Sequence, residues 1–321
     1  MVSRKMFFAE VDFQGEVKSP HQIEQQLLSS LNLEPFPTNA KLDFSSDPNY
    51  SGLKVFPLKQ YICFSYFFYS GNVDRFDRPV LSARVIGIAF HNLSYKAFDV
   101  FAIRNILISH SHELTTESQL NMKLEELSAF SDFSTFSNTI KQYDRKFIAK
   151  CVNGILKNDR GIIQFENITN AFLFLRTIFL LIPISVLKNK SFVTECENPG
   201  SEIREDFVFT QITRKSKSSF AIKDYFKKKD HEEMIIDITK SRIKHARKDA
   251  GLELLISEMI NHTTWYNIDW VERYLLLKEL LEGYHTDEKI NFIRSSDKLV
   301  KMNNTMKIVE SLNKKFGDKH D

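Results

Sequence analysis

The segment Tyr61–Tyr69, with the sequence YICFSYFFY, is aromatic or apolar at nearly every position. Such residues favour β-strands, and a continuous apolar run is typical of a strand that is covered on both faces. Val80–Phe90 predicts a second strand, joined to the first through Gly71, Asn72 and a charged turn. We therefore expect a hairpin-based sheet in this part of the chain.

The residues before this hairpin predict two further strands and a helix. In Met6–Phe13 apolar side chains alternate with acidic ones, which indicates a half-buried strand. A helix is predicted over Pro20–Leu31, because a capping-box pattern precedes an apolar stripe and proline suits the first helical position. Leu53–Phe56 predicts a short strand just before the aromatic one.

The middle of the chain changes from a period of two to helical spacing. Helices are predicted over 98–108, 116–130, 138–156 and 167–182, and short strands over 162–165, 191–195 and 206–213. The run Ala171–Leu187 is apolar almost all round, but it is too short to span a bilayer comfortably, and Arg176 and Pro183 interrupt it. We expect a helix in the centre of a core, and no membrane segment.

A change of composition at 214–219, RKSKSS, marks a predicted domain boundary. Beyond it the pattern predicts helices over 219–229, 231–250, 252–261, 268–283, 287–295 and 297–315. The expected fold class is therefore α+β, with a mixed or antiparallel sheet and packed helices, followed by an all-helical C-terminal domain. The two domains would be 1–213 and 214–321, the second entered through a basic segment.

Composition bounds the class of protein. With 10 Gly and 8 Pro in 321 residues, few tight turns and long elements are expected. The three cysteines, Cys63, Cys151 and Cys196, form no CxxC pair, which favours buried thiols in a reducing compartment. No secretory signal is recognised at the N-terminus, so we expect a cytoplasmic location.

Motifs of the common catalytic classes are missing from the sequence. It contains no GxxxxGK[ST], no GxGxxG after a strand, and no HExxH, GxSxG or EF-hand pattern. No catalytic residue, cofactor or metal is predicted, although a hydrolase with a dispersed active site stays open. His110 and His112 form the closest histidine pair; they would ligate a metal only with a third ligand, and a polar turn explains them more simply.

Charge is concentrated between the two apolar strands of the hairpin, where arginines alternate with carboxylates. Such pairs hold a turn rigid and can leave a guanidinium to meet an anion, although a solvated hairpin tip gives the same pattern. The candidate protein-binding residues are Asp74, Arg75, Asp77, Arg78 and Arg84.

The segment 214–248 holds twelve Lys and Arg against five Asp and Glu. In a helix, Arg242, His245 and Lys248 would share one face with Lys244 nearby, and this face could neutralise the phosphates of nucleic acid or bind an acidic partner. A solvated helix face is the simpler alternative. The candidate nucleic-acid-binding residues are Arg214, Lys227, Lys228, Lys229, Arg242, Lys244 and Lys248.

Two passages resemble the N-terminal and middle modules of the prokaryotic GTPase-associated proteins, which are adaptors of bacterial conflict and anti-phage systems. DRFDRPVLSA at 74–83 is similar to the family pattern D-R-x-G-R-P-G, with Asp77 and Val80 in place of the glycines and Arg84 near the position of a histidine. LIP at 181–183, followed by KSFVTE at 190–195, is similar to the second family signature. The resemblance covers 1–213 and implies an adaptor that works beside a small GTPase or another NTPase.

Taken together, these observations favour a non-enzymatic interaction protein with a protein partner. A nucleic-acid-binding effector is the first alternative, and the dispersed hydrolase is the second. The sequence does not specify an oligomeric state.

Overall fold

The computed structural model describes residues 6–12, 17–18, 25–31, 34–37, 51–73, 79–90, 100–109, 114, 116, 118–120, 122–123, 142–182, 187–194, 205–211, 234–247, 253 and 256–257. The strands are β1 (Met6–Asp12), β2 (Val17–Lys18), β3 (Ser51–Leu58), β4 (Tyr61–Val73), β5 (Pro79–Ala89), β6 (Gly161–Phe165), β7 (Phe192–Val193), β8 (Phe207–Gln211), β9 (Met234–Asp237) and β10 (Arg242–Lys244). The helices are α1 (Gln25–Leu31), α2 (Val100–Ser109), α5 (Arg145–Lys157) and α6 (Ile168–Leu181).

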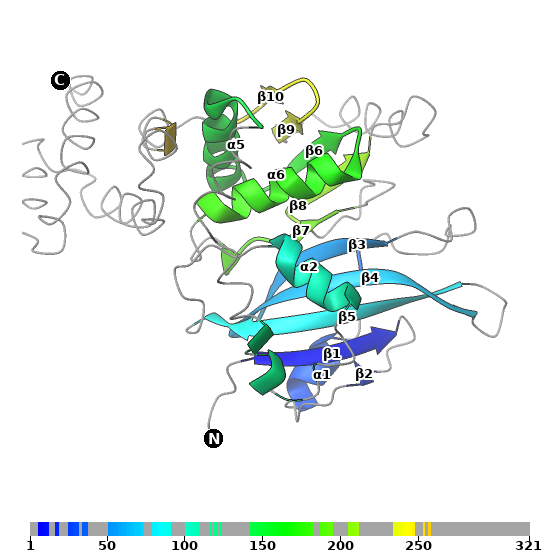
Figure 1. The fold of residues 1–321 in the computed structure, drawn as a ribbon. Helices are drawn as coiled ribbons and strands as arrows, with labels where there is room; N and C mark the ends of the chain where they lie inside the picture. The colour runs from blue at the N-terminus through cyan, green and yellow to red at the C-terminus, as the bar shows by residue number, and fades with distance from the viewer. Residues whose placement is uncertain are drawn as a thin grey trace, which may run out of the picture.

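All of these strands belong to one mixed sheet, in the order β10-β9-β6-β8-β7-β3-β4-β5-β1-β2 (Figure 1). From β3 to β2 every neighbouring pair is antiparallel. From β9 to β7 the neighbours are parallel, and β10 adds an antiparallel strand beyond β9. The antiparallel and parallel parts meet where β3 pairs with β7 in antiparallel fashion.

The prediction of a strand covered on both faces is confirmed for β4. Its Ile62 and Phe64 belong to a core cluster that also contains α2, α5 and α6. Its Cys63 and Phe67 belong to a second cluster, which includes the α1 residues Leu27 and Leu31. Because successive side chains of a strand point to opposite faces, one aromatic run supplies both cores.

The strand predicted at the N-terminus and the predicted core helix are also found. The strand is β1, but it is covered on both faces and not half-buried, because Met6 and Phe8 belong to one core cluster and Phe7, Ala9 and Val11 to the other. The helix predicted over 167–182 is α6, which begins after Asn167, whose side chain accepts a hydrogen bond from the Thr169 backbone N–H at 2.7 Å. In the part of the chain that the structure describes, no helix has both the length and the apolarity needed to cross a membrane.

The predicted all-helical C-terminal domain is wrong. Residues 234–237 and 242–244, within a helix predicted over 231–250, are instead β9 and β10 of the ten-stranded sheet. Met234 and Ile236 are buried in the core cluster that also contains residues of α5 and α6, and β9 pairs in parallel with β6 over Gly161–Gln164. The α+β class is therefore corrected to a single sheet-rich fold, whose sheet extends beyond residue 213. The predicted boundary itself, and the helices predicted after 257, lie outside the described residues.

One helix begins later than the sequence pattern predicts. The pattern predicts a helix from residue 138, whereas α5 begins at Arg145, after Asp144. The Asp144 carboxylate accepts a hydrogen bond from the Phe147 backbone N–H at 3.0 Å, so it satisfies a donor that has no partner within the helix. Residues 142–144 are not helical.

The junction between the two parts of the sheet is short but tightly bonded. Thr194, just after β7, donates its backbone N–H to the Leu53 carbonyl at 2.8 Å, and its hydroxyl oxygen accepts the Leu53 N–H at 2.8 Å. On the helical face, the Arg104 guanidinium of α2 lies 4.5 Å from the Phe172 ring of α6 and 5.8 Å from the Tyr66 ring of β4. Sheet and helices therefore both connect the two parts.

A buried ion pair lies beside this junction. Lys54 Nζ of β3 is 2.9 Å from Glu205 Oε1, just before β8, and the two side chains are 5% and 2% exposed. The same ammonium donates to the Phe36 carbonyl at 2.9 Å. A buried pair of this kind adds little stability over an apolar pair, but removing one partner leaves a charge without compensation.

We predict that Lys54→Met lowers the free energy of unfolding by about 3 kcal/mol, because the buried Glu205 carboxylate loses its ion pair with Lys54. The double variant Lys54→Met/Glu205→Gln should lose clearly less, since no buried charge remains. Urea denaturation of the three proteins measures both values. Equal losses in the single and double variants would show that the ion pair is not what matters at this position.

Candidate interaction surfaces

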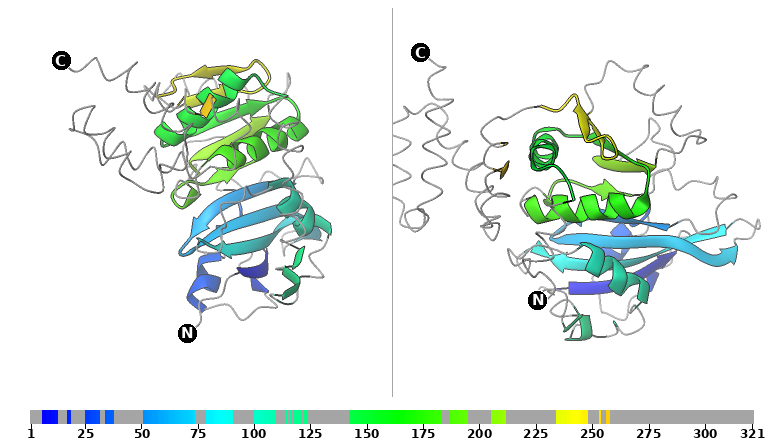
Figure 2. Two further views of the ribbon diagram at one scale, coloured as in Figure 1. Left: turned by 60° about the vertical axis from the view of Figure 1, so that its left-hand side comes forward. Right: turned by 45° about the horizontal axis from the view of Figure 1, so that its top comes forward.

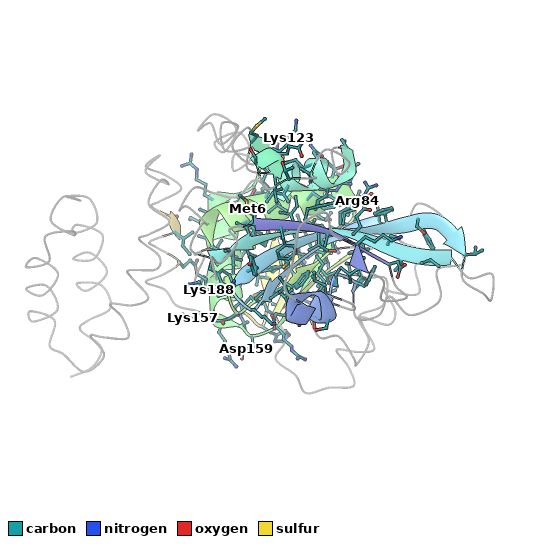
Figure 3. All side chains as sticks on the ribbon, turned by 90° about the horizontal axis from the view of Figure 1, so that it is seen from below. Met6, Arg84, Lys123, Lys157, Asp159 and Lys188 are labelled. Carbon is teal, nitrogen blue, oxygen red and sulfur yellow. The ribbon has the colours of Figure 1, made fainter. Side chains whose placement is uncertain are left out.

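The β4–β5 hairpin extends beyond its neighbouring strands. β1 pairs with β5 as far as Asp12 opposite Ser82, and β3 pairs with β4 as far as Ser51 opposite Phe68. The hairpin continues through the pairs Tyr69–Leu81 and Val73–Pro79. We call residues 69–73 and 79–81 the arm; it projects from the body of the sheet in Figure 1, in the right-hand view of Figure 2 and in Figure 3. Within the described residues, the arm has two strands.

The arm is fixed at its base and open at its far end. Leu81 is 1% exposed, and Tyr69 packs on the core cluster under α1. The Ser70 hydroxyl donates to the Val80 carbonyl at 3.0 Å. The register shifts between Tyr69 and Val73, and Gly71 has a φ of 77°, which glycine adopts without strain.

Val73, the last residue of β4, is 58% exposed. The four charged candidates that follow it in the sequence, Asp74, Arg75, Asp77 and Arg78, lie outside the described residues. In the sequence they join Val73 to Pro79, so the arm is the element that carries them.

Arg84, the fifth candidate, lies on β5 and forms its hydrogen bonds and its ion pair with other residues of the same chain. Its Nη1 donates to the Leu107 carbonyl at 3.0 Å and to the Ile108 carbonyl at 3.1 Å, at the C-terminal end of α2. Its Nε forms an ion pair with Glu10 Oε1 at 3.4 Å. A cation at this end of a helix satisfies carbonyls that have no helical partner and interacts favourably with the helix dipole. The structure thus gives Arg84 a part in holding α2 on the sheet.

Two of the seven basic candidates are described, and they lie on an edge strand. Arg242 and Lys244 of β10 are exposed, whereas Ile243 between them packs against the core. The helical face predicted for Arg242 and His245 does not form, because His245 follows the strand with a φ of 53°. The remaining five, Arg214, Lys227, Lys228, Lys229 and Lys248, lie outside the described residues.

Three more exposed basic or imidazole side chains surround these two. They are Lys240, in the turn between β9 and β10, and His245 and Arg247, after β10. We call Lys240, Arg242, Lys244, His245 and Arg247 the basic edge. It lies at the end of the strand order, with β9, β6, β8, β7 and β3 between it and the arm.

Sequence reasoning missed a polar cluster where β6 and β8 begin. Lys190 Nζ donates to the Asn158 carbonyl at 2.5 Å and lies 5.3 Å from the Phe207 ring. Burial lowers the pKa of Lys190, and the carboxylates of Asp206 and Asp159 oppose that shift. Figure 3 shows Lys157, Asp159 and Lys188 on this side of the molecule, away from the arm.

Its geometry assigns this cluster to stability. Asp206 Oδ2 accepts hydrogen bonds from the Ser191 backbone N–H at 2.7 Å and from the Ser191 hydroxyl at 2.9 Å, which ties the start of β7 to the start of β8. Ligands of parallel sheets bind beyond the carboxyl ends of the strands, and this cluster lies at the opposite ends. No local pattern signals it, because its members come from three separate segments.

The described residues contain no group of three or more His, Cys, Asp or Glu side chains that could hold a metal ion. His110 and His112 lie outside them. Cys63 and Cys151 are buried free thiols, and burial raises the pKa of both. This agrees with the buried thiols that the sequence predicts at these two positions.

We predict that neither Cys63 nor Cys151 reacts with iodoacetamide in the folded protein at neutral pH, because only the thiolate is nucleophilic and both groups are buried. Mass spectrometry of a Cys196→Ser variant, with and without urea, should show labelling of both only after unfolding. Rapid labelling without urea would contradict the burial of these thiols.

Because the pKa of Cys63 is raised in the folded state, the free energy of unfolding should fall as the pH rises above the ordinary thiol pKa of 9.0.

Comparison with known proteins gives no assignment. No protein-family model matches the chain, and no curated protein matches its sequence. Function is therefore argued from the surfaces described above.

Proposed function

We propose that this protein is a non-enzymatic adaptor that binds a protein partner through the arm. The observation that supports this most directly is the extension of β4 and β5 beyond β1 and β3, ending in the exposed Val73. A two-stranded ribbon is at best marginally stable by itself, and its outer part contributes little to the core. Such an extension is therefore more readily explained by binding than by folding.

Three cations near the core have structural partners within the molecule, which agrees with an interaction role for the protein. Lys54 pairs with Glu205, Arg84 binds the end of α2, and Lys190 is bonded to Asn158. Each of these side chains has a structural partner. The charged residues that the arm carries, Asp74, Arg75, Asp77 and Arg78, supply charge-assisted contacts beside the apolar Val73, the combination found in many protein interfaces.

The partner class follows from the resemblance of 74–83 to the prokaryotic GTPase-associated proteins. We propose a small GTPase or another NTPase as the partner, in a conflict or anti-phage system. In this proposal the arm is the contact, and the parallel part of the sheet supports it through the β3–β7 junction.

We predict that Val73→Glu weakens capture of the partner by about tenfold to a hundredfold, a loss of about 1.4 to 2.8 kcal/mol, because it places a charge at the apolar end of the arm. The matched control is Met122→Glu, since Met122 is the other large apolar side chain that is strongly exposed among the described residues, at 56%. Affinity-tagged proteins expressed in the native cells, with quantitative mass spectrometry, measure the NTPase recovered by each.

A second variant separates the charged residues from the apolar one. Arg75→Glu/Arg78→Glu should also reduce recovery. Thermal unfolding should be unchanged in Val73→Glu and Met122→Glu, because Val73 and Met122 are exposed. If no NTPase is enriched with the unmodified chain, or if Val73→Glu recovers as much as Met122→Glu, the arm is not the binding site.

A further inference from the structure

We infer that the basic edge binds the phosphate backbone of double-stranded nucleic acid. This site is separate from the arm, because five strands lie between them in the sheet order. It contains Lys240, Arg242, Lys244, His245 and Arg247, all of them exposed.

Strand geometry places the central cations on one side. Side chains two apart in a strand point the same way, so Arg242 and Lys244 project outward together while Ile243 packs inward. Their spacing along the strand is about 6.7 Å, twice the rise per residue. Two exposed cations at this spacing can contact separate phosphates of one duplex.

Among the residues that the structure describes, acidic side chains compensate this charge only in part. Segment 234–247 contains four Lys and Arg and one acidic residue, Asp237. Asp237 accepts the Lys240 backbone N–H at 2.9 Å and lies 3.8 Å from Lys240 Nζ. From outside the segment, Asp159 lies 4.0 Å from Arg247 Nη1, with both side chains exposed. Neither ion pair involves Arg242 or Lys244.

The basic edge is held on a rigid support. The Arg247 backbone N–H is bonded to Asn158 Oδ1 at 3.5 Å, at the end of α5. A side chain at Gly154 of α5 would lie 2.4 Å from Met234 Sδ and 3.4 Å from Ala246 Cβ, so glycine allows β9 and the residues after β10 to approach the helix closely. The exposed cations therefore project from a backbone that is fixed on both sides.

The chemistry of the surface favours a duplex over other acidic partners. Protein interfaces are usually organised around buried apolar or aromatic side chains, and residues 240–247 expose none, because Ile243 and Ala246 pack on the core. Binding of single strands depends on aromatic stacking, and segment 234–247 contains no Phe, Tyr or Trp. Phosphate binding by a duplex requires only cations and hydrogen-bond donors.

The test is fluorescence anisotropy of the full chain with a labelled DNA duplex and a labelled RNA duplex of mixed sequence. Binding in about the micromolar range at physiological salt is expected for backbone contacts, with affinity falling steeply as salt rises. Arg242→Glu/Lys244→Glu should weaken binding at least about tenfold and lower the slope of log K against log salt by about 2, since each lost phosphate contact contributes about 0.9.

The matched control, Lys18→Glu/Lys59→Glu, makes the same change of net charge on exposed residues of the antiparallel part and should bind like the unmodified chain. If Arg242→Glu/Lys244→Glu does not fold, as judged by circular dichroism, Arg242→Gln/Lys244→Gln replaces it with the same expectation. Three results would overturn the inference: equal loss in the control, no loss in the β10 variant, or displacement of the duplex by polyglutamate of equal charge, which would indicate an acidic protein as the ligand.

Discussion

The pairing of β3 with β7 is the constraint on which the rest of the structure depends. Only Lys54 and Val55 of β3 are in register with β7, yet this contact turns an antiparallel sheet and a parallel one into a single sheet. Thr194 reinforces it from one strand, and the buried pair of Lys54 with Glu205 reinforces it through side chains. Because these charged groups are buried, a displacement at the junction would break their ion pair in a place where water does not replace it, so the junction favours one geometry.

Much of the antiparallel part could be predicted from the sequence, because its signals are local. The alternation in Met6–Asp12 and the aromatic run from Tyr61 each indicate a strand, and the aromatic run also indicates that both of its faces are covered. The helix α6 could also be predicted from the sequence, since a helix that is apolar nearly all round belongs in a core. In each case the residues that decide the structure lie within the element itself.

The errors arise where distant segments decide. MIIDI at 234–238 is compatible with a strand or a helix, and the charged residues after it favoured the prediction of a helix. The strand β6, which pairs with this segment and decides its structure, lies about seventy residues earlier in the chain. The role of Arg84 as a binding residue stays a prediction, but nothing near it in the sequence reveals the Leu107 and Ile108 carbonyls that it contacts. Exposed charge on β10 was anticipated as a basic segment, but its arrangement on a strand was not.

The two outermost strands have a consequence for the behaviour of the protein in concentrated solution. β2 has two residues and β10 has three, and both carry exposed lysine. Such short, charged borders offer few unpaired backbone groups to a neighbouring copy, so the molecules resist joining strand to strand into fibrils. At these two strands, a sheet of this width is therefore a poor template for its own polymerisation.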